Sequence, residues 1–267
     1  MKKCFISISI VTSFLFTSCE EVIELDLNQH EKRVVIDANL FVGENNYNKI
    51  RLYYSAPFYA DGYEEISNAT VLIKNISSSE TYSFTYDVNG YYVNNNFNPE
   101  IDATYELEVA IADNVYTATS KVWIAPEIEN VEQINDAGFT GDSYELRFYY
   151  QDPEETEDYY LAQTIDTEEN DFSVSSDQFT NGNLISDLYF ADEEQLGETI
   201  FYALAKIDKN YYNYLNKMFS NAASAGNPFA TPTGTLKGNI VNTTNTEDFV
   251  LGYFHIAKRN STTYTIE

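Results

Sequence analysis

The sequence predicts a mostly β protein, in which an antiparallel β-sandwich over residues 19–125 is followed by a second β-rich domain over residues 126–267 with one helix near residues 209–223. Three observations predict this class. Apolar and polar residues alternate with a period of two along much of the chain, as half-buried strands require. Aromatic residues make up 15% of the chain, with 23 Tyr and 17 Phe, which is typical of pleated surfaces where the ring packs and the tyrosine hydroxyl reaches water. Turns rich in Asn and Asp recur at the spacing of a sandwich.

The first 18 residues predict a secretory signal peptide. Lys2 and Lys3 precede an apolar run over residues 5–16, and small residues lead up to Cys19. The run is shorter than the roughly 20 apolar residues that a membrane-spanning helix needs. We expect cleavage before Cys19 and lipidation of this residue, because two acyl chains hold a protein stably on a membrane. The predicted location is therefore the outer membrane, through an N-terminal lipid.

Two points about this segment stay open. A plain secretory signal, cut near Thr17 or Ser18, would leave Cys19 unmodified. The acidic pair at residues 20–21 fits either a signal for export to the cell-surface face or a short solvated tether, so the periplasmic face is equally compatible. Cys4 leaves with the signal peptide, so the mature chain is expected to form no internal disulfide.

The charge of the chain excludes two kinds of partner. It has 15 Lys and Arg against 42 Asp and Glu, a formal net charge of −27. Nucleic-acid binding needs a basic surface that displaces counterions from phosphate, and peripheral attachment to anionic lipid needs a polybasic patch. We interpret the acidic surface as one that keeps the protein soluble and apart from its own copies. Attraction to cations or to a basic partner is the alternative.

The first domain is expected to hold about eight strands, as a sandwich of this length does. Asn89 and Gly90 predict a tight hairpin turn because both tolerate positive φ, and Asp113 and Asn114 predict a second hairpin. Residues 125–127 interrupt the pattern and are interpreted as the boundary between the domains. The expected strands cover residues 22–27, 33–42, 49–53, 69–74, 82–86, 91–93, 104–111 and 115–124.

Beyond that boundary the pattern is sparser. The helical spacing of apolar residues such as Tyr211 and Leu215 predicts a helix over residues 211–223, which ends before the Gly- and Pro-containing loop at residues 226–234. We interpret the apolar stripe of this helix as a surface that docks on a sheet rather than as a ligand site. No element is assigned to residues 166–197. The expected strands cover residues 144–150, 159–165, 199–207, 249–257 and 262–266.

Several segments, in their order and spacing along the chain, resemble a known family. They are residues 18–25, 33–38, 66–73, 89–92, 104–109, 236–240 and 250–254. With these segments the whole chain resembles the DUF4249 family of Bacteroidetes lipoproteins, and its N-terminal part is similar to an Ig-like or prealbumin-like (carboxypeptidase regulatory-like) β-sandwich. The resemblance implies an accessory role beside TonB-dependent outer-membrane receptors, in uptake or envelope assembly, and it implies no active-site residues. The short second domain and residues 166–197 depart from the family pattern.

We expect the protein not to be an enzyme, with no cofactor and no catalytic residue. His30 and His255 are its two histidines, in a polar turn and an apolar strand, and no Gly-x-Ser-x-Gly elbow or Gly-rich phosphate loop accompanies them. Two histidines without a free cysteine make a poor zinc site. The many carboxylates leave a glycosidase-like acid–base pair open by counting alone.

The acidic composition makes calcium the metal to consider. Asp166, Glu168, Glu169 and Asp171 lie close together in the sequence, and residues 152–158 form a second acidic segment that offers hard oxygen ligands. Neither segment has glycine at the position that an EF-hand loop requires. We therefore predict no metal site and interpret both segments as solvated acidic loops.

The sequence thus predicts a cell-envelope lipoprotein that acts as a non-enzymatic accessory or binding subunit of a TonB-dependent outer-membrane transporter. The alternative is a free-standing surface adhesin or glycan-binding lipoprotein. The transporter partner is inferred from the family resemblance, and the envelope location from Cys19.

Replacing Cys19 with alanine (C19A) is expected to abolish palmitate labelling of the protein and to release it from membranes, because this residue is the predicted attachment site of the lipid. Metabolic labelling with palmitate and membrane fractionation measure the two effects. C4A is the matched control, since Cys4 lies in the part that is cleaved off. Unchanged labelling of C19A would refute the lipid anchor.

Overall fold

A computed structural model describes residues 32–42, 48–57, 60, 62–139, 141–224 and 234–267, which belong to one structural unit from Lys32 to Glu267. The predicted signal peptide, Cys19, His30, the expected strand at residues 22–27 and most of the expected loop at residues 226–234 lie outside the described residues. Among the residues that are described, no helix is long and apolar enough to cross a membrane.

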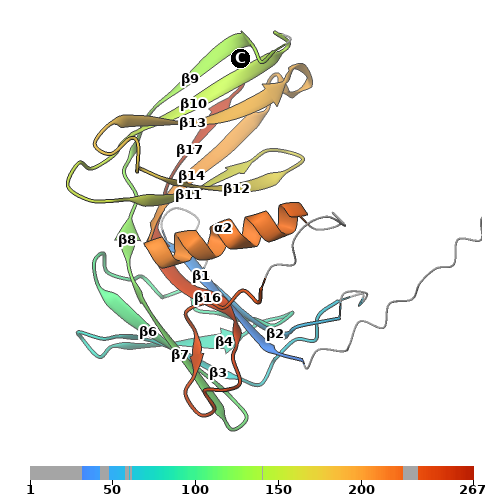
Figure 1. Ribbon diagram of the computed structural model, residues 1–267, viewed down its shortest axis with the longest axis vertical. Helices are drawn as coiled ribbons and strands as arrows, with labels where there is room; N and C mark the ends of the chain where they lie inside the picture. The colour runs from blue at the N-terminus through green and yellow to red at the C-terminus, as the bar shows by residue number, and fades with distance from the viewer. Residues whose placement is uncertain (1–31, 43–47, 58–59, 61, 140, 225–233) are drawn as a thin grey trace, which may run out of the picture. The chain divides into compact units, whose positions relative to one another are not determined.

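The described residues form seventeen strands, one α-helix and one short 3-10 helix (Figure 1). In chain order they are β1 (Val34–Val42), β2 (Lys49–Tyr54), β3 (Thr70–Asn75), β4 (Thr81–Tyr86), β5 (Tyr91–Val93), β6 (Thr104–Ile111), β7 (Asn114–Lys121), β8 (Trp123–Ile124), β9 (Ile128–Ala137), β10 (Ser143–Gln151), β11 (Tyr159–Ile165), β12 (Asn170–Ser176), β13 (Leu184–Asp192), the 3-10 helix η2 (Glu193–Gln195), β14 (Thr199–Ile207), α2 (Lys209–Ser224), β15 (Val241–Asn242), β16 (Leu251–Lys258) and β17 (Asn260–Thr265). The prediction of a mostly β fold with one helix is confirmed.

Ten strands form one sheet around a single core, in the order β15-β7-β6-β3-β4-β5-β2-β1-β16-β8. Alternate residues from both halves of this sheet point inward and meet. Ile36 of β1 and Leu107 of β6, for example, are fully buried in the same cluster. The predicted β-sandwich is therefore confirmed. One feature differs from the expected antiparallel arrangement, because β16 runs parallel to both of its neighbours, β1 and β8.

Both predicted hairpins are present. Asn89 and Gly90 have φ angles of 52° and 79° between β4 and β5, as the predicted tight turn requires. A Cβ on Gly90 would lie 2.4 Å from the carbonyl oxygen of Leu52, so the position requires glycine. In the second hairpin, between β6 and β7, the turn is formed by Ala112 and Asp113, one residue earlier than predicted.

The tail of the chain returns to the first sheet, although the sequence analysis assigned it to the second domain. β15 pairs with β7, and β16 pairs with β1. Two glycines permit this packing: a Cβ on Gly252 would lie 2.0 Å from the carbonyl oxygen of Ile36, and one on Gly238 would lie 1.7 Å from that of Gly252. The Asn239 amide then bonds both backbone groups of Phe254, at 2.9 and 2.8 Å. The predicted domain boundary itself stays a prediction.

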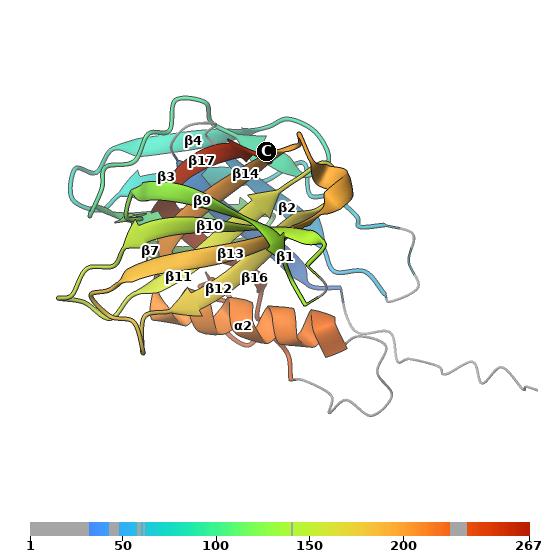
Figure 2. The same cartoon turned by 90° about the horizontal axis from the view of Figure 1, so that it is seen from above.

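The remaining strands form a second sandwich. β13-β10-β9 make a three-stranded sheet and β12-β11-β14-β17 a four-stranded sheet, and Figure 2 shows the first in front of the second. Between them Phe148 of β10 stacks on Tyr202 of β14, with ring centroids 4.2 Å apart. β9, β12 and β13 were not predicted. In β13 the alternation is hidden, because Leu188 and Phe190 are exposed while Asp187 turns inward to accept the Tyr202 hydroxyl.

Two of the chain's crossings between the two sandwiches lie side by side. One leads from β8 to β9 by way of Ala125 and Pro126, and the other leads from β16 to β17 through Arg259. The Ala125 N–H donates to the Lys258 carbonyl at 3.1 Å. The Asn260 amide donates to the carbonyls of Ala125 and Pro126, at 2.8 and 3.0 Å. These bonds hold the two crossings together.

Helix α2 packs against both sandwiches (Figure 1). Its residues Tyr211 and Leu215 share one buried cluster with Leu161 of β11 and Tyr253 of β16. The helix therefore contacts the four-stranded sheet of the second sandwich and the ten-stranded sheet of the first. The prediction that its apolar stripe docks on a sheet is confirmed, and it docks on two.

Asp208 caps the N-terminus of α2. Its Oδ1 accepts the backbone N–H groups of Asn210 at 2.9 Å and Tyr211 at 3.1 Å, which satisfies donors that the helix leaves unpaired. Burial pushes the pKa of Asp208 upward, but the adjacent His255 and these two donors outweigh burial, so the pKa lies below its ordinary value. Oδ2 lies 3.7 Å from His255 Nδ1, which is too long for a hydrogen bond.

One buried tyrosine in each core illustrates how its hydroxyl group bonds to the protein. Tyr92 of the first core donates to the Ile66 carbonyl at 3.1 Å, and Tyr202 of the second donates to the Asp187 carboxylate at 2.6 Å. Both tyrosines are almost completely buried. The expectation that the hydroxyl reaches water is therefore wrong for these residues, since a buried hydroxyl must find a partner inside.

Replacing Asp208 with alanine (D208A) is expected to lower the free energy of unfolding by about 1 kcal/mol at neutral pH, because the N-cap is lost. D208N keeps an acceptor at the cap and is expected to lose less. The contribution of Asp208 is present above its ordinary pKa of 3.8 and is lost as the pH falls through the lowered folded-state pKa. Chemical denaturation followed by circular dichroism, repeated at several pH values, measures these differences. Equal stability of D208A and the wild type at neutral pH would contradict the role of the cap.

Candidate functional site

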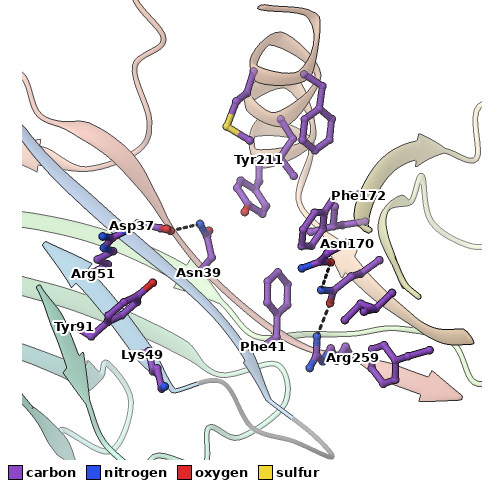
Figure 3. A pocket seen from close by; sticks show the side chains of 17 residues that line it. Asp37, Asn39, Phe41, Lys49, Arg51, Tyr91, Asn170, Phe172, Tyr211 and Arg259 are labelled. Atoms are coloured by element: carbon purple, nitrogen blue, oxygen red, sulfur yellow. Dashed lines mark hydrogen bonds between the residues drawn. The ribbon is translucent and has the colours of Figure 1, made fainter. Parts of the chain in front are cut away.

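A cleft of about 660 Å³ lies between the two sandwiches, alongside α2 (Figure 3). Its lining comes from β1, β2 and β5 of the first sheet, from β11, β12 and β14 of the second sandwich, and from the helix. A cleft of this volume is in the range of small-molecule sites, which often lie where domains meet. The cleft is therefore the candidate functional site.

Strand alternation decides which residues face the cleft. In β1 the even-numbered residues from Ile36 to Leu40 are buried in the first core, so Asp37, Asn39 and Phe41 lie on the opposite face and line the cleft. The same alternation in β11 and β14 turns one set of residues into the second core and the other set toward the cleft and α2.

One end of the cleft is polar. The Asn39 amide donates to Asp37 Oδ1 at 2.6 Å. Asp37 keeps contact with solvent yet is surrounded by protein, and this enclosure raises the pKa of its carboxyl group against the opposing effects of Asn39 and Arg51. The Arg51 guanidinium lies 5.1 Å from the ring centroid of Tyr91 and 5.2 Å from that of Tyr53. This end offers a ligand a carboxylate, an amide, tyrosine rings and the cationic side chains of Lys49 and Arg51.

The other end combines Arg259 with aromatic rings. The Arg259 Cζ lies 5.9 Å from the ring centroid of Phe41 and 5.7 Å from that of Phe201. Its Nη1 donates to Gln163 Oε1 at 2.9 Å, and the Gln163 amide donates in turn to Asn170 Oδ1 at 2.8 Å. Burial lowers the pKa of Arg259 from its ordinary value, but a guanidinium stays protonated at neutral pH. A permanent positive charge therefore faces this end of the cleft.

The C-terminal half of α2 supplies an apolar wall. Leu215, Met218 and Phe219 line the cleft, and Met218 is exposed. The sequence analysis interpreted the helical stripe as a docking surface alone and did not anticipate this wall. The stripe continues past the residues that dock, so its last turns border the cleft.

The geometry of the cleft can now be set beside known proteins. The family described as "Domain of unknown function (DUF4249)" matches residues 20–263. The chain belongs to the DUF4249 family. The match includes both sandwiches and every residue that lines the cleft. No curated protein sequence matches this DUF4249 chain.

Three solved structures are similar to the DUF4249 chain at low sequence identity. They are the chicken interferon gamma receptor alpha chain (9% identity, 66% of this chain and 89% of that chain, TM-score 0.21), the FN1-FN3 domains of chicken CNTN1 (9% identity, 67% and 61%, TM-score 0.24) and a segment of two fibronectin type-III domains from chicken tenascin (10% identity, 65% and 91%, TM-score 0.20). At these TM-scores the three structures carry no argument about the cleft.

His255 of the DUF4249 chain is enclosed rather than placed in the cleft. It is fully buried in β16, and its ring stacks on Tyr211 of α2 with centroids 4.5 Å apart. Burial lowers the pKa of His255, against the effect of Asp208, so the ring is neutral at neutral pH. The prediction that His255 is a strand residue is confirmed.

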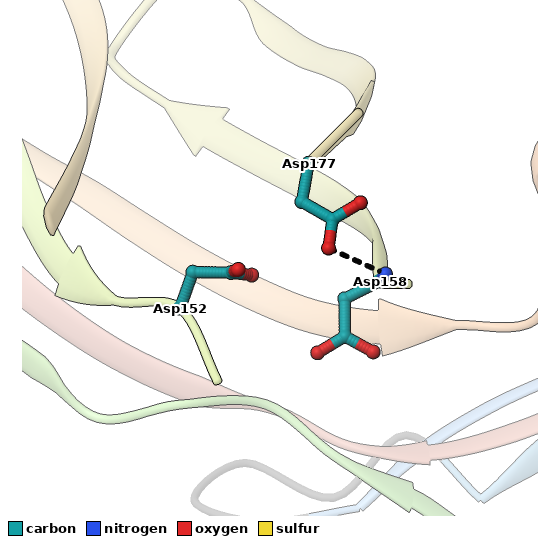
Figure 4. A group of neighbouring side chains, drawn as sticks. All are labelled: Asp152, Asp158 and Asp177. Carbon is teal, nitrogen blue, oxygen red and sulfur yellow. Dashed lines mark hydrogen bonds between the residues drawn. The ribbon is translucent and has the colours of Figure 1, made fainter. Parts of the chain in front are cut away.

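Three aspartates of the DUF4249 chain meet at one end of the second sandwich (Figure 4). Asp152, Asp158 and Asp177 are each only 1% exposed, and one carboxylate oxygen from each lies within 4.8 Å of the others. The interpretation of residues 152–158 as a solvated loop is therefore wrong for Asp152 and Asp158. Asp177 was missed because it lies in the segment to which the sequence analysis assigned no element.

Donors of the protein occupy most oxygens of this aspartate cluster. Asp152 accepts the Tyr160 hydroxyl and a backbone N–H at 2.9 Å. Asp158 forms an ion pair with Lys206 at 2.6 Å, and its own N–H donates to Asp177 Oδ2 at 2.8 Å. Among the described residues, Asp177 Oδ1 has no partner. The cluster is thus a buried polar network between loops, and the absence of a metal site stays a prediction.

The second acidic segment forms an exposed turn between β11 and β12. Asp166 Oδ1 accepts the backbone N–H groups of Glu168 and Glu169, both at 2.7 Å, and Oδ2 accepts the Tyr189 hydroxyl at 2.6 Å. The Asp166 carboxylate therefore shapes the turn. The described structure does not bring this segment into the aspartate cluster.

Replacing Asp177 with asparagine (D177N) is expected to raise the melting temperature at neutral pH by about 2–4 °C, which corresponds to ~1 kcal/mol. Burial raises the pKa of Asp177. The hydrogen bond from the Asp158 N–H lowers this pKa, and the negative charges of Asp152 and Asp158 raise it further. The folded state therefore loses stability as the pH rises from 3.8 through the raised pKa. Asparagine removes that cost and keeps an acceptor for the Asp158 N–H.

Thermal denaturation at pH 7 and below pH 4 measures this effect, and we expect the gain of D177N to vanish in acid, where aspartate is protonated in both states. The wild type is expected to melt at the same temperature in calcium as in EDTA. A lower melting temperature of D177N together with a calcium-dependent rise in the wild type would instead identify a cation site.

Proposed function

We propose that this chain is a non-enzymatic accessory subunit of the bacterial cell envelope, tethered to the outer membrane by a lipid on Cys19, that binds a ligand in its cleft and docks on a TonB-dependent outer-membrane transporter. The observation that carries the binding function is the cleft between the sandwiches, where a few polar groups converge among aromatic and apolar side chains. The transporter partner comes from the family resemblance.

The chemistry of the cleft favours binding over catalysis. A glycosidase-like mechanism needs two carboxyl groups about 5–10 Å apart, and Asp37 is the one carboxylate among the described residues that line the cleft. The described histidine, His255, is enclosed beneath α2 and cannot reach a ligand there. What the cleft offers is hydrogen-bonding, charge and aromatic surface, which suit recognition.

An edge strand supports the docking part of the proposal. β13 pairs with β10 alone in the described sheet, so its other side presents unpaired backbone groups. Its outer face exposes Leu184, Leu188 and Phe190, each 54% exposed. Unpaired strand edges and clustered exposed apolar side chains are typical of protein-interaction surfaces. We therefore place the transporter contact at this β13 face, which is defined by these three residues.

Affinity purification of the tagged full chain from solubilised outer membranes is expected to recover a stoichiometric β-barrel protein. L188D is expected to reduce that recovery about tenfold or more, because a charge replaces a buried apolar contact in the complex. I76D is the matched control, since Ile76 is 49% exposed on the first sandwich, away from β13. Recovery of no β-barrel protein, or equal losses in L188D and I76D, would count against the proposed docking.

A free-standing adhesin or glycan-binding lipoprotein is the second candidate. The polar end of the cleft favours it, because Asp37, Asn39 and Tyr91 supply the hydrogen-bonding and aromatic groups that contact sugars. Binding of the isolated chain to a glycan array, without a co-purifying β-barrel protein, would support this candidate over the first.

A further inference from the structure

Arg259 differs from the other arginines of the chain. Arg33 pairs with Asp248 at 3.3 Å and Arg147 pairs with Glu145 at 2.5 Å. Arg51 is held among tyrosine rings at the polar end of the cleft. No carboxylate of the described residues forms an ion pair with Arg259, although the chain has 42 Asp and Glu. Its Nε is buried without a hydrogen-bond partner.

A guanidinium whose Nε is buried without a partner is costly to a folded protein. A buried donor without a partner costs roughly 1–3 kcal/mol, and more when it carries a charge. Phe41 and Phe201 give Arg259 aromatic contact, but rings at nearly 6 Å do not replace a hydrogen-bond acceptor. The cleft is where an acceptor can reach the terminal nitrogens of the guanidinium, because Arg259 lines that cleft.

The hydrogen bonds around Arg259 occupy the side-chain oxygens of Gln163 and Asn170 and leave N–H donors for a ligand. A guanidinium only donates, so Gln163 must turn its oxygen to Arg259 and its NH₂ group to Asn170. Asn170 must then accept with its own oxygen, which leaves its NH₂ group toward the cleft. The donors that remain for a ligand are Arg259 Nη2 and Asn170 Nδ2, since Arg259 Nε is itself buried. A set made of donors matches a group made of acceptors.

We propose that the Arg259 end of the cleft binds an oxyanion, a carboxylate or a phosphate, carried by a ligand whose apolar or aromatic part packs on Phe41, Phe172 and Phe201. The oxyanion accepts from Arg259 and Asn170, and the planar guanidinium suits two parallel hydrogen bonds to such a group. The proposal rests on the proposed binding function of the cleft and names the class of its ligand.

The surroundings of Arg259 fit the rest of such a ligand. Phe172 on β12 is exposed and lines the cleft together with Phe41 and Phe201 (Figure 3). Asp37 lies four residues along β1 from Phe41, about 13 Å at the rise of a strand. A ligand that fills the cleft therefore meets Arg259 at one end and, at the other end, the Asp37 carboxylate beside the cationic side chains of Lys49 and Arg51.

Three small probes test the proposal by calorimetric titration of the full chain. Phenylacetate and phenyl phosphate carry the two oxyanions on an aromatic ring, and 2-phenylethanol is the neutral counterpart of phenylacetate. We expect at least one anion to bind at about 1 mM or tighter and about tenfold or more tightly than 2-phenylethanol. Comparison of the two anions distinguishes the carboxylate source from the phosphate source.

Two variants make the test specific to this end of the cleft. R259Q removes the charge, and N170D replaces the uncommitted NH₂ donor with a carboxylate at an exposed position. Each is expected to weaken anion binding about tenfold or more and to leave 2-phenylethanol unaffected. R147Q is the control, because Arg147 lies outside the cleft. Melting temperatures verify that each variant is folded. If R259Q does not fold, N170D still tests the site.

The possible results distinguish a failure of the oxyanion site from a failure of the proposed accessory function. Equal affinity for phenylacetate and 2-phenylethanol, equal losses in R147Q and N170D, or no binding of either anion at about 1 mM would overturn the oxyanion site. Recovery of a β-barrel partner that L188D abolishes would support the docking function whatever the probes show.

Discussion

The cleft depends on one constraint, which is that two of the chain's passages between the two sandwiches are adjacent and hydrogen-bonded to each other. A single crossing would act as a hinge. Here the crossing at Ala125 and the one at Arg259 are joined by backbone and side-chain hydrogen bonds, with Asn260 donating to two carbonyls of the neighbouring crossing. Because two linked crossings resist rotation about either one, the outer face of β1 and the outer face of the four-stranded sheet keep a fixed separation. Helix α2 then packs on both faces and leaves the cleft beside its last turns.

Polar side chains complete this arrangement at places where regular pairing ends. Asn239 supplies Phe254 with the donor and acceptor that a neighbouring strand would supply, and Asp208 does the same for the first turn of α2. The aspartate cluster joins loops of the second sandwich through Tyr160 and Lys206. Each of these groups is expensive to bury unless its partners are present. The protein has no expected internal disulfide, so the orientation of its parts relies on such bonds and on aromatic packing.

Turns and strands that depend on neighbouring residues could be predicted from the sequence. Strands that depend on contacts with residues far away in the sequence could not. The hairpin at Asn89 and Gly90 was predictable because positive φ is a local requirement. β13 was not, since its outward Leu188 and inward Asp187 invert the usual alternation, and Asp187 is acceptable inside because Tyr202, distant in the sequence, donates to it. The parallel pairing of β16 with β1 is likewise a long-range event. Of the site, aromatic content and the helical stripe were visible in the sequence, whereas Arg259 acquires its position only when β16 and β17, on either side of it, join different sheets.

The chain has a net charge of −27, so it can bind an oxyanion only if the charges nearest the ligand matter more than the total charge. Exposed carboxylates act over distances that physiological salt screens within about 8 Å. Arg259 acts at contact, from a half-buried position where the effective dielectric constant is lower and the attraction correspondingly stronger. The two effects select the same kind of ligand. The acidic surface opposes the approach of polyanions, whereas a ligand with one negative charge and an apolar body is repelled weakly on approach and held firmly once its charge reaches the guanidinium.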